Sequence, residues 1–309
     1  MKKHFRELSV AFALALLLAV LAVKAPAFFQ PKQFIPTLTD AAPIILLACG
    51  MSLVIICRQI DISVGSQFAV CSVVVGLAAK SLPMPVVALI AILTGAAFGA
   101  FNGLFIAGLR LPSIVVTLAT MVTWREALRW WREGEYVRDL PPSFQWLGLG
   151  QASGQWALLA ITLLVFLGLV FALKHLSGGR FIYAVGSDAE AARLAGINPQ
   201  RLTFAVFLLM GALVGLAALV SAVRFPDVDP KSGTGHELRA IAAAVVGGVA
   251  ISGGRGKLWG VLAGALLLAF IAPALVFLGA PAQWEKAIQG AIILLAVAAD
   301  GWRTRKEQR

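Results

Sequence analysis

The sequence predicts an all-α, polytopic membrane protein with about ten transmembrane helices, some of them short or broken. Of its 309 residues, 60% are hydrophobic and only 13% are charged, whereas about a quarter of the residues in soluble domains are charged. The apolar residues form runs about as long as a bilayer is thick, and the polar residues lie between these runs. We therefore expect a single transmembrane domain that spans residues 1–309.

The individual helices follow from the length of each apolar run, because a hydrocarbon core of about 30 Å needs roughly 20 apolar residues per helix. The runs lie at residues 8–27, 41–57, 62–79, 85–108, 113–131, 155–174, 203–223, 238–252, 258–278 and 285–300. The run at 238–252 is too short to cross as a plain helix, so we expect it to be broken or paired with irregular backbone. The junction at residues 58–66 has the same character.

Residues 233–256, GTGHELRAIAAAVVGGVAISGGRG, combine a charged segment, an apolar run with a Gly pair, and a basic Gly-rich turn. A glycine inside a soluble helix costs roughly 1 kcal/mol relative to alanine. In a bilayer, small residues allow helices to approach one another closely. The composition of this segment therefore favours a packed membrane helix.

Residues 1–30 begin with charged residues, continue with an apolar run and contain Ala25-Pro26-Ala27, features shared with cleaved signal peptides. Because many more spans follow, we expect an uncleaved first helix instead. Ten spans place both termini on the same side, and the loops of that side are richer in Lys and Arg, for example Arg110 and Lys257. The positive-inside rule then predicts that both termini are cytoplasmic.

Composition also argues against several classes of function. The net charge of +11 does not indicate nucleic-acid binding, because the basic residues are scattered between apolar runs. Cys49, Cys57 and Cys71 lie in apolar runs without a CxxC pair, and the three histidines are far apart, so we expect no metal site. We expect no catalytic residues and no cofactor. The turn at Gly256 and Lys257 lacks the spacing of a phosphate-binding loop, so the chain has no ATPase motif of its own.

The longest polar interruption on the cytoplasmic side is the loop at residues 175–202. Ser187 and Asp188 offer a helix N-cap, residues 189–195 are mostly strong helix formers, and Gly196 is a natural stop. We expect a short amphipathic helix outside the bilayer. It either gives an external motor a rigid element to push or is a solvated loop helix without a partner.

Asp61, Ser63 and Ser66 interrupt an apolar region and are candidate residues of a transport pathway. Acidic residues near the membrane usually face a partner or a water-filled path. The alternatives are that Asp61 pairs with Arg58 or that it caps the following helix through a free backbone N–H.

Further polar residues in the apolar runs are also pathway candidates. Asn102 either hydrogen-bonds across helices or lines the pathway, and packing is the simpler expectation. Thr117 and Thr120 share one helical face, and their hydroxyls either line the pathway or bond to their own preceding turn. We expect His236 and Glu237 at the outer mouth or in a re-entrant turn.

Glu126 and Arg129 lie one helical turn apart near the outer end of the fifth run, beside three tryptophans. This pattern is typical of an interfacial aromatic belt with an ion pair. The alternative is a docking surface for an extracytoplasmic binding protein, together with residues 132–138 and 224–231.

Together, segments over residues 41–302 resemble the permease subunits of ATP-binding-cassette (ABC) importers of the ribose, xylose, rhamnose and autoinducer-2 type. The segments are IDISVGS at 60–66, FNG at 101–103, LPSIVVTLAT at 111–120, the stretch at 233–256 and QGAIILLAVAADGWRTR at 289–305. The residues that look like the family's coupling helix, which docks in a groove of the ATPase subunit, are Gly186, Glu190, Ala191, Ala192, Arg193 and Gly196, with Asp188 as the expected cap. Many members have a Gly pair where this chain has Arg58-Gln59.

The resemblance implies a dimer of permease subunits, homomeric or heteromeric, surrounded by membrane lipid in a bacterial inner membrane. It also implies two further partners, a cytoplasmic ABC ATPase that binds the ATP and a periplasmic sugar-binding protein. Residues 133–151 and 224–240 look most like rhamnose permeases, with autoinducer-2 permeases next. The competing hypotheses are an ion-coupled carrier, which would bury acidic residues mid-span, and a non-transporting membrane receptor. Glu126, Glu237 and Glu285 lie nearer the ends of the runs, which disfavours the carrier.

Overall fold

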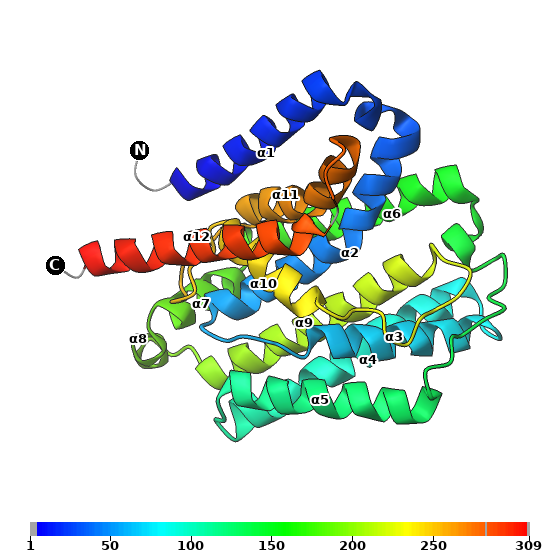
Figure 1. The fold of residues 1–309 in the computed structure, drawn as a ribbon. Coiled ribbons are helices and arrows are strands. Elements are labelled where there is room, and N and C mark those ends of the chain that lie inside the picture. Colours follow the sequence, from blue (N-terminus) through cyan, green and yellow to red (C-terminus); the bar gives the residue numbers. More distant parts are fainter. Residues whose placement is uncertain (1–4, 282, 308–309) are drawn as a thin grey trace.

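The computed structural model describes residues 5–281 and 283–307, and Figure 1 shows them as a bundle of helices. The helices are α1 (Phe5–Lys24), α2 (Pro31–Ile56), α3 (Val64–Ala79), α4 (Met84–Gly103), α5 (Ser113–Arg132), α6 (Gln151–His175), α7 (Ser177–Ser187), α8 (Ala189–Leu194), α9 (Pro199–Ala222), α10 (His236–Val246), α11 (Leu258–Phe277) and α12 (Trp284–Glu307). Short helical turns lie at Pro26–Phe29, Leu104–Gly108 and Gln145–Gly148. In the described part of the chain, the β-structure is an isolated bridge between Val137 and Val228.

The ten predicted runs coincide with α1 to α6 and α9 to α12, which confirms the all-α class. By length and composition, five helices among the described residues could cross a membrane. They are Pro31–Ile56, Met84–Gly108, Gln151–His175, Pro199–Ala222 and Leu258–Phe277. The run predicted at 238–252 is only partly helical, since α10 ends at Val246 and a turn-rich segment follows, as we expected for a run too short to cross as a plain helix.

Helix α2 forms the centre of the bundle, and its residues from Ala41 to Ile56 are all buried. Helices α4 and α9 pack together through glycines on both sides, Gly95 and Gly99 on α4 and Gly211 and Gly215 on α9. A side chain at any of these positions would collide with the backbone of the facing helix. Small residues four apart on both helices thus bring the two backbones into contact, as is common between helices in membranes.

Helix α1 begins and α12 ends at the same end of the bundle, where α7 and α8 also lie (left in Figure 1). We call this end the α8 end, and the opposite end, where α5 finishes at Arg132, the α5 end. Both described ends of the chain therefore lie on one side, together with the loop at 175–202.

Candidate functional site

Two irregular segments enter the bundle from opposite ends and meet inside it. Residues 57–63 lead inward from the α8 end to the start of α3, and residues 223–235 return from the α5 end to the start of α10 (Figure 1). They meet where Gly65 packs against Gly233, whose φ of +81° suits glycine. A Cβ on Gly65 would run into the Gly233 carbonyl oxygen and the Glu237 carboxylate. Helices α3 and α10 therefore both begin inside the bundle.

A buried polar cluster occupies the start of α3, and Ser63 lies at its centre. Asp61 Oδ1 accepts hydrogen bonds from the Ser63 backbone N–H, at 2.9 Å, and from the Ser63 hydroxyl. Gln67 Nε2 donates to Ser63 Oγ at 2.8 Å and to Asp61 Oδ2 at 3.2 Å. From α4, Asn102 Nδ2 donates to Ser63 Oγ at 2.8 Å. All four residues have 0% exposure, so this cluster ties α4 to the irregular start of α3 without contact with water.

These contacts test the structural roles that the sequence left open for Asp61 and Asn102 beside a pathway role. Asp61 does not pair with Arg58, because the Arg58 guanidinium donates to the Ser187 carbonyl oxygen instead. Asp61 accepts the N–H of Ser63, the residue before α3, which is close to the predicted capping role. Asn102 hydrogen-bonds across helices, as expected. Ser66 Oγ donates to the Ser63 carbonyl oxygen at 2.8 Å, which places its hydroxyl beside the same cluster.

Thr117 and Thr120 are buried on the face of α5 that packs against the bundle. Thr117 Oγ1 donates to the Ser113 carbonyl oxygen at 2.8 Å, and Thr120 Oγ1 donates to the Thr117 carbonyl oxygen at 3.3 Å. Both hydroxyls thus bond to their own preceding turn, which was one of the two expectations. Thr117 also lies 3.4 Å from the Ile60 carbonyl oxygen, so it borders the irregular segment before α3.

His236 and Glu237 form the first turn of α10 and lie at the end of a re-entrant segment, one of the two places expected for them. The His236 ring lies against Phe68 of α3, with 4.8 Å between the ring centroids. Glu237 is 8% exposed although it lies at the end of a helix, because that helix begins inside the bundle. Glu237 therefore lies near the end of an apolar run in the sequence but inside the bundle in the structure.

Sequence reasoning missed Gln67, although it lies four residues after Ser63 on the same helix and could have been found by that spacing. Several polar atoms in and beside the cluster lack a hydrogen-bond partner: Gln67 Oε1, Asn102 Oδ1, Glu237 Oε2 and His236 Nδ1. Buried polar groups without partners are uncommon and mark places where a ligand or water supplies the missing bond. This region is therefore a candidate part of a polar pathway.

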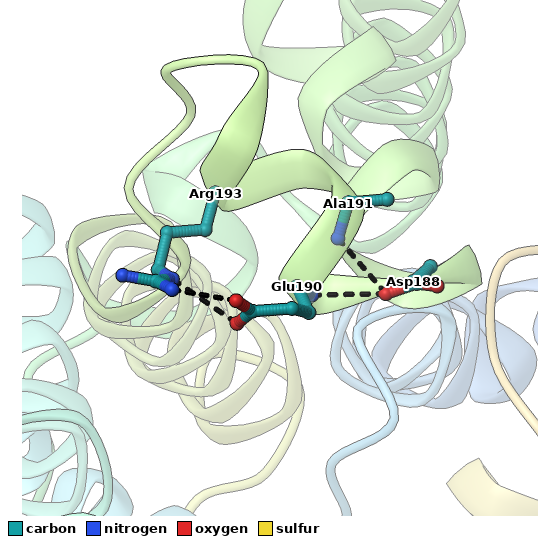
Figure 2. Close-up of polar contacts among 4 residues, drawn as sticks. All are labelled: Asp188, Glu190, Ala191 and Arg193. Atoms are coloured by element: carbon teal, nitrogen blue, oxygen red, sulfur yellow. Dashed lines mark hydrogen bonds and ion pairs between the residues drawn. The ribbon is translucent and has the colours of Figure 1, made fainter.

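The predicted cytoplasmic helix is α8, and its cap is Asp188 (Figure 2). Asp188 Oδ1 accepts the backbone N–H groups of Glu190 and Ala191 at 2.9 and 3.0 Å, and these bonds lower the pKa of the Asp188 carboxyl. Glu190 and Arg193 form a two-pronged ion pair, which lowers the pKa of Glu190 and raises that of Arg193.

The rest of α8 also follows the prediction, since the helix ends at Leu194 and Gly196 adopts a φ of +83° just beyond it. Ala192 is buried toward the protein, whereas Ala191 and the charged pair face outward. Leu194 is 79% exposed at the tip of the helix. Helix α7, which precedes α8 in the same loop, was not predicted.

Three backbone segments cross at the base of α8. Gly186 packs against the Ile56 carbonyl oxygen, which also accepts the Gly254 N–H at 2.8 Å. Arg58 Nη2 donates to the Ser187 carbonyl oxygen at 2.5 Å. We call this contact of residues 56–58, 186–187 and 253–254 the glycine junction. It joins the cap of α8 to the end of α2 and to the turn between α10 and α11.

Within the described residues, no group of three or more His, Cys, Asp or Glu side chains is placed to hold a metal ion. The three cysteines are free and buried. The polar groups of the candidate site are hydroxyl, amide and carboxyl groups, which are suited to hydrogen bonding with a small polar ligand.

A helical bundle with several apolar helices long enough to span a bilayer is the architecture of a multi-pass membrane protein. The chain belongs to the family described as branched-chain amino acid transport system / permease component, which matches residues 33–297. The chain is 38% identical over 298 residues to the autoinducer 2 import system permease protein LsrC of Enterobacter sp. (strain 638), covering 96% of this chain and 87% of that protein. It is 34% identical over 307 residues to the ribose import permease protein RbsC of Escherichia coli (strain K12), covering 97% of this chain and 95% of that protein. No solved structure matched the chain.

Proposed function

We propose that this chain is the permease subunit of an ABC importer that carries a monosaccharide or a similar small polyhydroxylated compound across a bacterial inner membrane. Relatives that match almost its whole length are named for the import of autoinducer 2 and ribose, which favours this class of substrate over branched-chain amino acids. Among sugars, the outer segments 133–151 and 224–240 favour rhamnose, and autoinducer 2 is next. The proposed partners are a second permease subunit, a cytoplasmic ATPase and a periplasmic sugar-binding protein.

The observation that carries the proposal is the way α8 is built and attached. It is a capped helix outside the bundle whose outward face presents the Glu190–Arg193 pair and the exposed Leu194. A small apolar tip flanked by charges suits a groove in a motor subunit. The α8 end, with both described chain ends, is the cytoplasmic side in this proposal.

Movement of α8 would reach the polar cluster through the glycine junction. Ser187 directly precedes the cap Asp188, and its carbonyl oxygen accepts the hydrogen bond from Arg58. Arg58 lies three residues before Asp61, the carboxylate of the buried cluster. The path from the exposed helix to the cluster is thus short: it consists of close backbone contacts and the one hydrogen bond from the Arg58 side chain. ATP-driven closure of the motor would in this way open and close a pathway lined by small and hydroxyl-bearing residues.

The test is the double variant Glu190→Ala with Arg193→Ala. Exposed ion pairs of this kind contribute little to stability, so membrane insertion should be unchanged. We expect sugar uptake to fall about tenfold, equivalent to roughly 1.4 kcal/mol of lost coupling, while ATP hydrolysis continues uncoupled. The matched control is Lys24→Ala with Lys80→Ala, two exposed charges at the ends of α1 and α3. Full uptake by the α8 variant would refute the coupling role.

An ion-coupled carrier is a second candidate, because the carboxylates of Asp61 and Glu237 are both buried inside the bundle. Buried acidic residues are typical of proton- and ion-coupled transporters. Uptake into intact cells, which retain the binding protein, separates the two functions. An importer loses uptake when ATP is depleted, whereas a carrier loses it with a protonophore and is indifferent to ATP.

A further inference from the structure

A cavity of about 760 Å³ opens at the α5 end of the protein. It lies between the last turns of α5 and the segment that leads back to α10, and its wall includes Arg125, Glu126, Arg129, Trp130, Lys231 and Thr234. Small-molecule sites in proteins have volumes of about 300–1,000 Å³. The cavity is therefore large enough for a monosaccharide together with several water molecules.

The charges on the wall favour a neutral ligand. Three cationic side chains and the carboxylates of Glu126 and Glu133 lie around one space, and Glu126 and Arg129 are only 3.6 Å apart. A site for phosphate or a lipid phosphate group would present cations without acidic neighbours at the same wall. A neutral polyol, in contrast, uses both donors and acceptors, because each hydroxyl donates one hydrogen bond and accepts others.

An aromatic surface is also available. The Trp130 side chain lines the cavity and is 84% exposed, so most of the residue's surface is free of contacts with the described residues. The C–H face of a sugar ring is apolar and packs well against an aromatic ring, which has an apolar face and a polar edge. Arg125 Nη2 and Ser232 Oγ, on residues of the same wall, are buried without a hydrogen-bond partner. After small side-chain rotations, a hydroxyl-rich ligand would supply partners for both groups.

The cavity and the buried polar cluster are built on neighbouring parts of the chain. Ala69 on its wall lies on α3, one turn beyond Ser66, and Thr234 follows Gly233, which packs against Gly65. His236 and Glu237 come directly after this segment. The wall of the cavity and the cluster therefore share two elements, the first turns of α3 and the re-entrant segment before α10.

We propose that this cavity is the outer sugar site, where the transported monosaccharide first contacts the permease, and this inference rests on the proposed import function. The indole of Trp130 packs against the sugar ring, and the charged side chains of α5 and Lys231 exchange hydrogen bonds with its hydroxyls. The site then passes the sugar along the re-entrant segment toward Asp61 and Ser63. Its side chains are largely exposed, which suits the weak binding that transport requires.

The test places a cysteine in the cavity through Thr234→Cys and measures its labelling by a membrane-impermeant maleimide in native membrane vesicles. Arg138→Cys, an exposed position of the same end outside the cavity wall, is the matched control. The natural cysteines are buried and contribute little labelling. Ribose, rhamnose, xylose and autoinducer 2 are the probes, counted together as sugars, with inorganic phosphate as the anionic comparison.

We expect at least one sugar, at about ten times its Kd, to slow labelling of the T234C variant about tenfold, because only the unoccupied fraction reacts. Labelling of the R138C variant should not change, and adding Trp130→Ala to T234C should abolish the protection. Three results would each overturn the site. Phosphate could protect the cysteine as well as sugar does, both cysteines could be protected alike, or none of the sugars could protect. The readout needs neither ATP nor a motor, so a chain that binds sugar here but shows no ATP-dependent uptake would refute the import function and leave the site standing.

Discussion

The two ends of the molecule are built in opposite ways. At the α8 end, three backbone segments touch at Gly186 and Gly254, and direct hydrogen bonds join residues 56–58 to Ser187 and Gly254. At the α5 end, long charged side chains and an indole surround a cavity of about 760 Å³. At the α8 end, backbone contacts leave no room for a side chain at Gly186 or Gly254. At the α5 end, side chains surround open space.

This difference indicates how one chain could serve the two proposed roles, transmission of movement at one end and ligand binding at the other. Close-packed backbone transmits displacement because it is nearly incompressible. Exposed polar side chains can adapt to a ligand and release it again, because binding changes their conformational entropy only a little. Changes at the α8 end should therefore act on stability and coupling, and changes at the α5 end on the handling of substrate.

The largest effect is expected for Gly186→Ala, which tests the packing of the glycine junction. The new Cβ would meet the backbone carbonyl of Ile56, which cannot rotate away, so we expect destabilisation of about 1–3 kcal/mol and loss of uptake. Thermal unfolding in detergent and uptake into vesicles measure the two effects. Gly178→Ala lies in the same helix and meets no atom within 4 Å, so it should behave as the wild type. If the two variants had the same thermal stability and the same uptake, the α8 end would not be the tightly packed end that we describe.

A smaller and more selective effect is expected for Arg58→Ala. The Arg58 side chain is exposed apart from its bond to Ser187, so the protein should still fold. Loss of the link should lower uptake about fivefold, equivalent to roughly 1 kcal/mol, and raise the ATP hydrolysed per sugar carried. Arg58→Lys keeps a donor and should recover part of the coupling. An Ala variant with an unchanged ratio of ATP to sugar would show that movement does not pass through Arg58.

The smallest effect concerns the pH dependence of the α8 cap. The pKa of Asp188 is lowered in the folded protein, so its capping contributes stability above the unfolded value of 3.8 and loses it as the pH falls through the lower folded pKa. Hydrogen exchange of the Glu190 and Ala191 amides should therefore quicken in acid relative to an Asp188→Asn variant, which caps without a charge. The two proteins should match near neutral pH. An identical response of both to acid would mean that the carboxylate charge has no part in the cap.

Local chemistry made some elements predictable. Helix α8 was found because its cap, Asp188, and the N–H groups that it accepts lie within three residues, and because Gly196 stops the helix. The helical spans followed from apolar runs, since the bilayer thickness sets their length. Helix α7 was missed because its Ser-Gly-Gly start resembles a break. Gly179 is in fact needed there, since it packs against the backbone of Ala172 and Leu173.

The polar residues were predicted individually, but the sequence did not predict that they contact one another. Asp61, Ser63 and Asn102 were candidates because each interrupts an apolar run, but nothing in the sequence placed Asn102 on Ser63, 39 residues away. The wall of the cavity at the α5 end joins α5 to a segment about a hundred residues later, so its two halves could not be matched from spacing alone. Glu237 was expected nearer a span end, yet it is buried because α10 begins inside the bundle.

By itself, the sequence determined that this chain is an all-α membrane protein, where most of its helices run and how α8 is capped. These features depend on the period of hydrophobicity and on contacts between residues that are close in sequence. Tertiary structure alone decided that α3 and α10 begin inside the bundle, that glycines join α8 to α2, and that the α5 end is hollow. Those features depend on contacts between distant segments, whose geometry is fixed only when all the helices pack together.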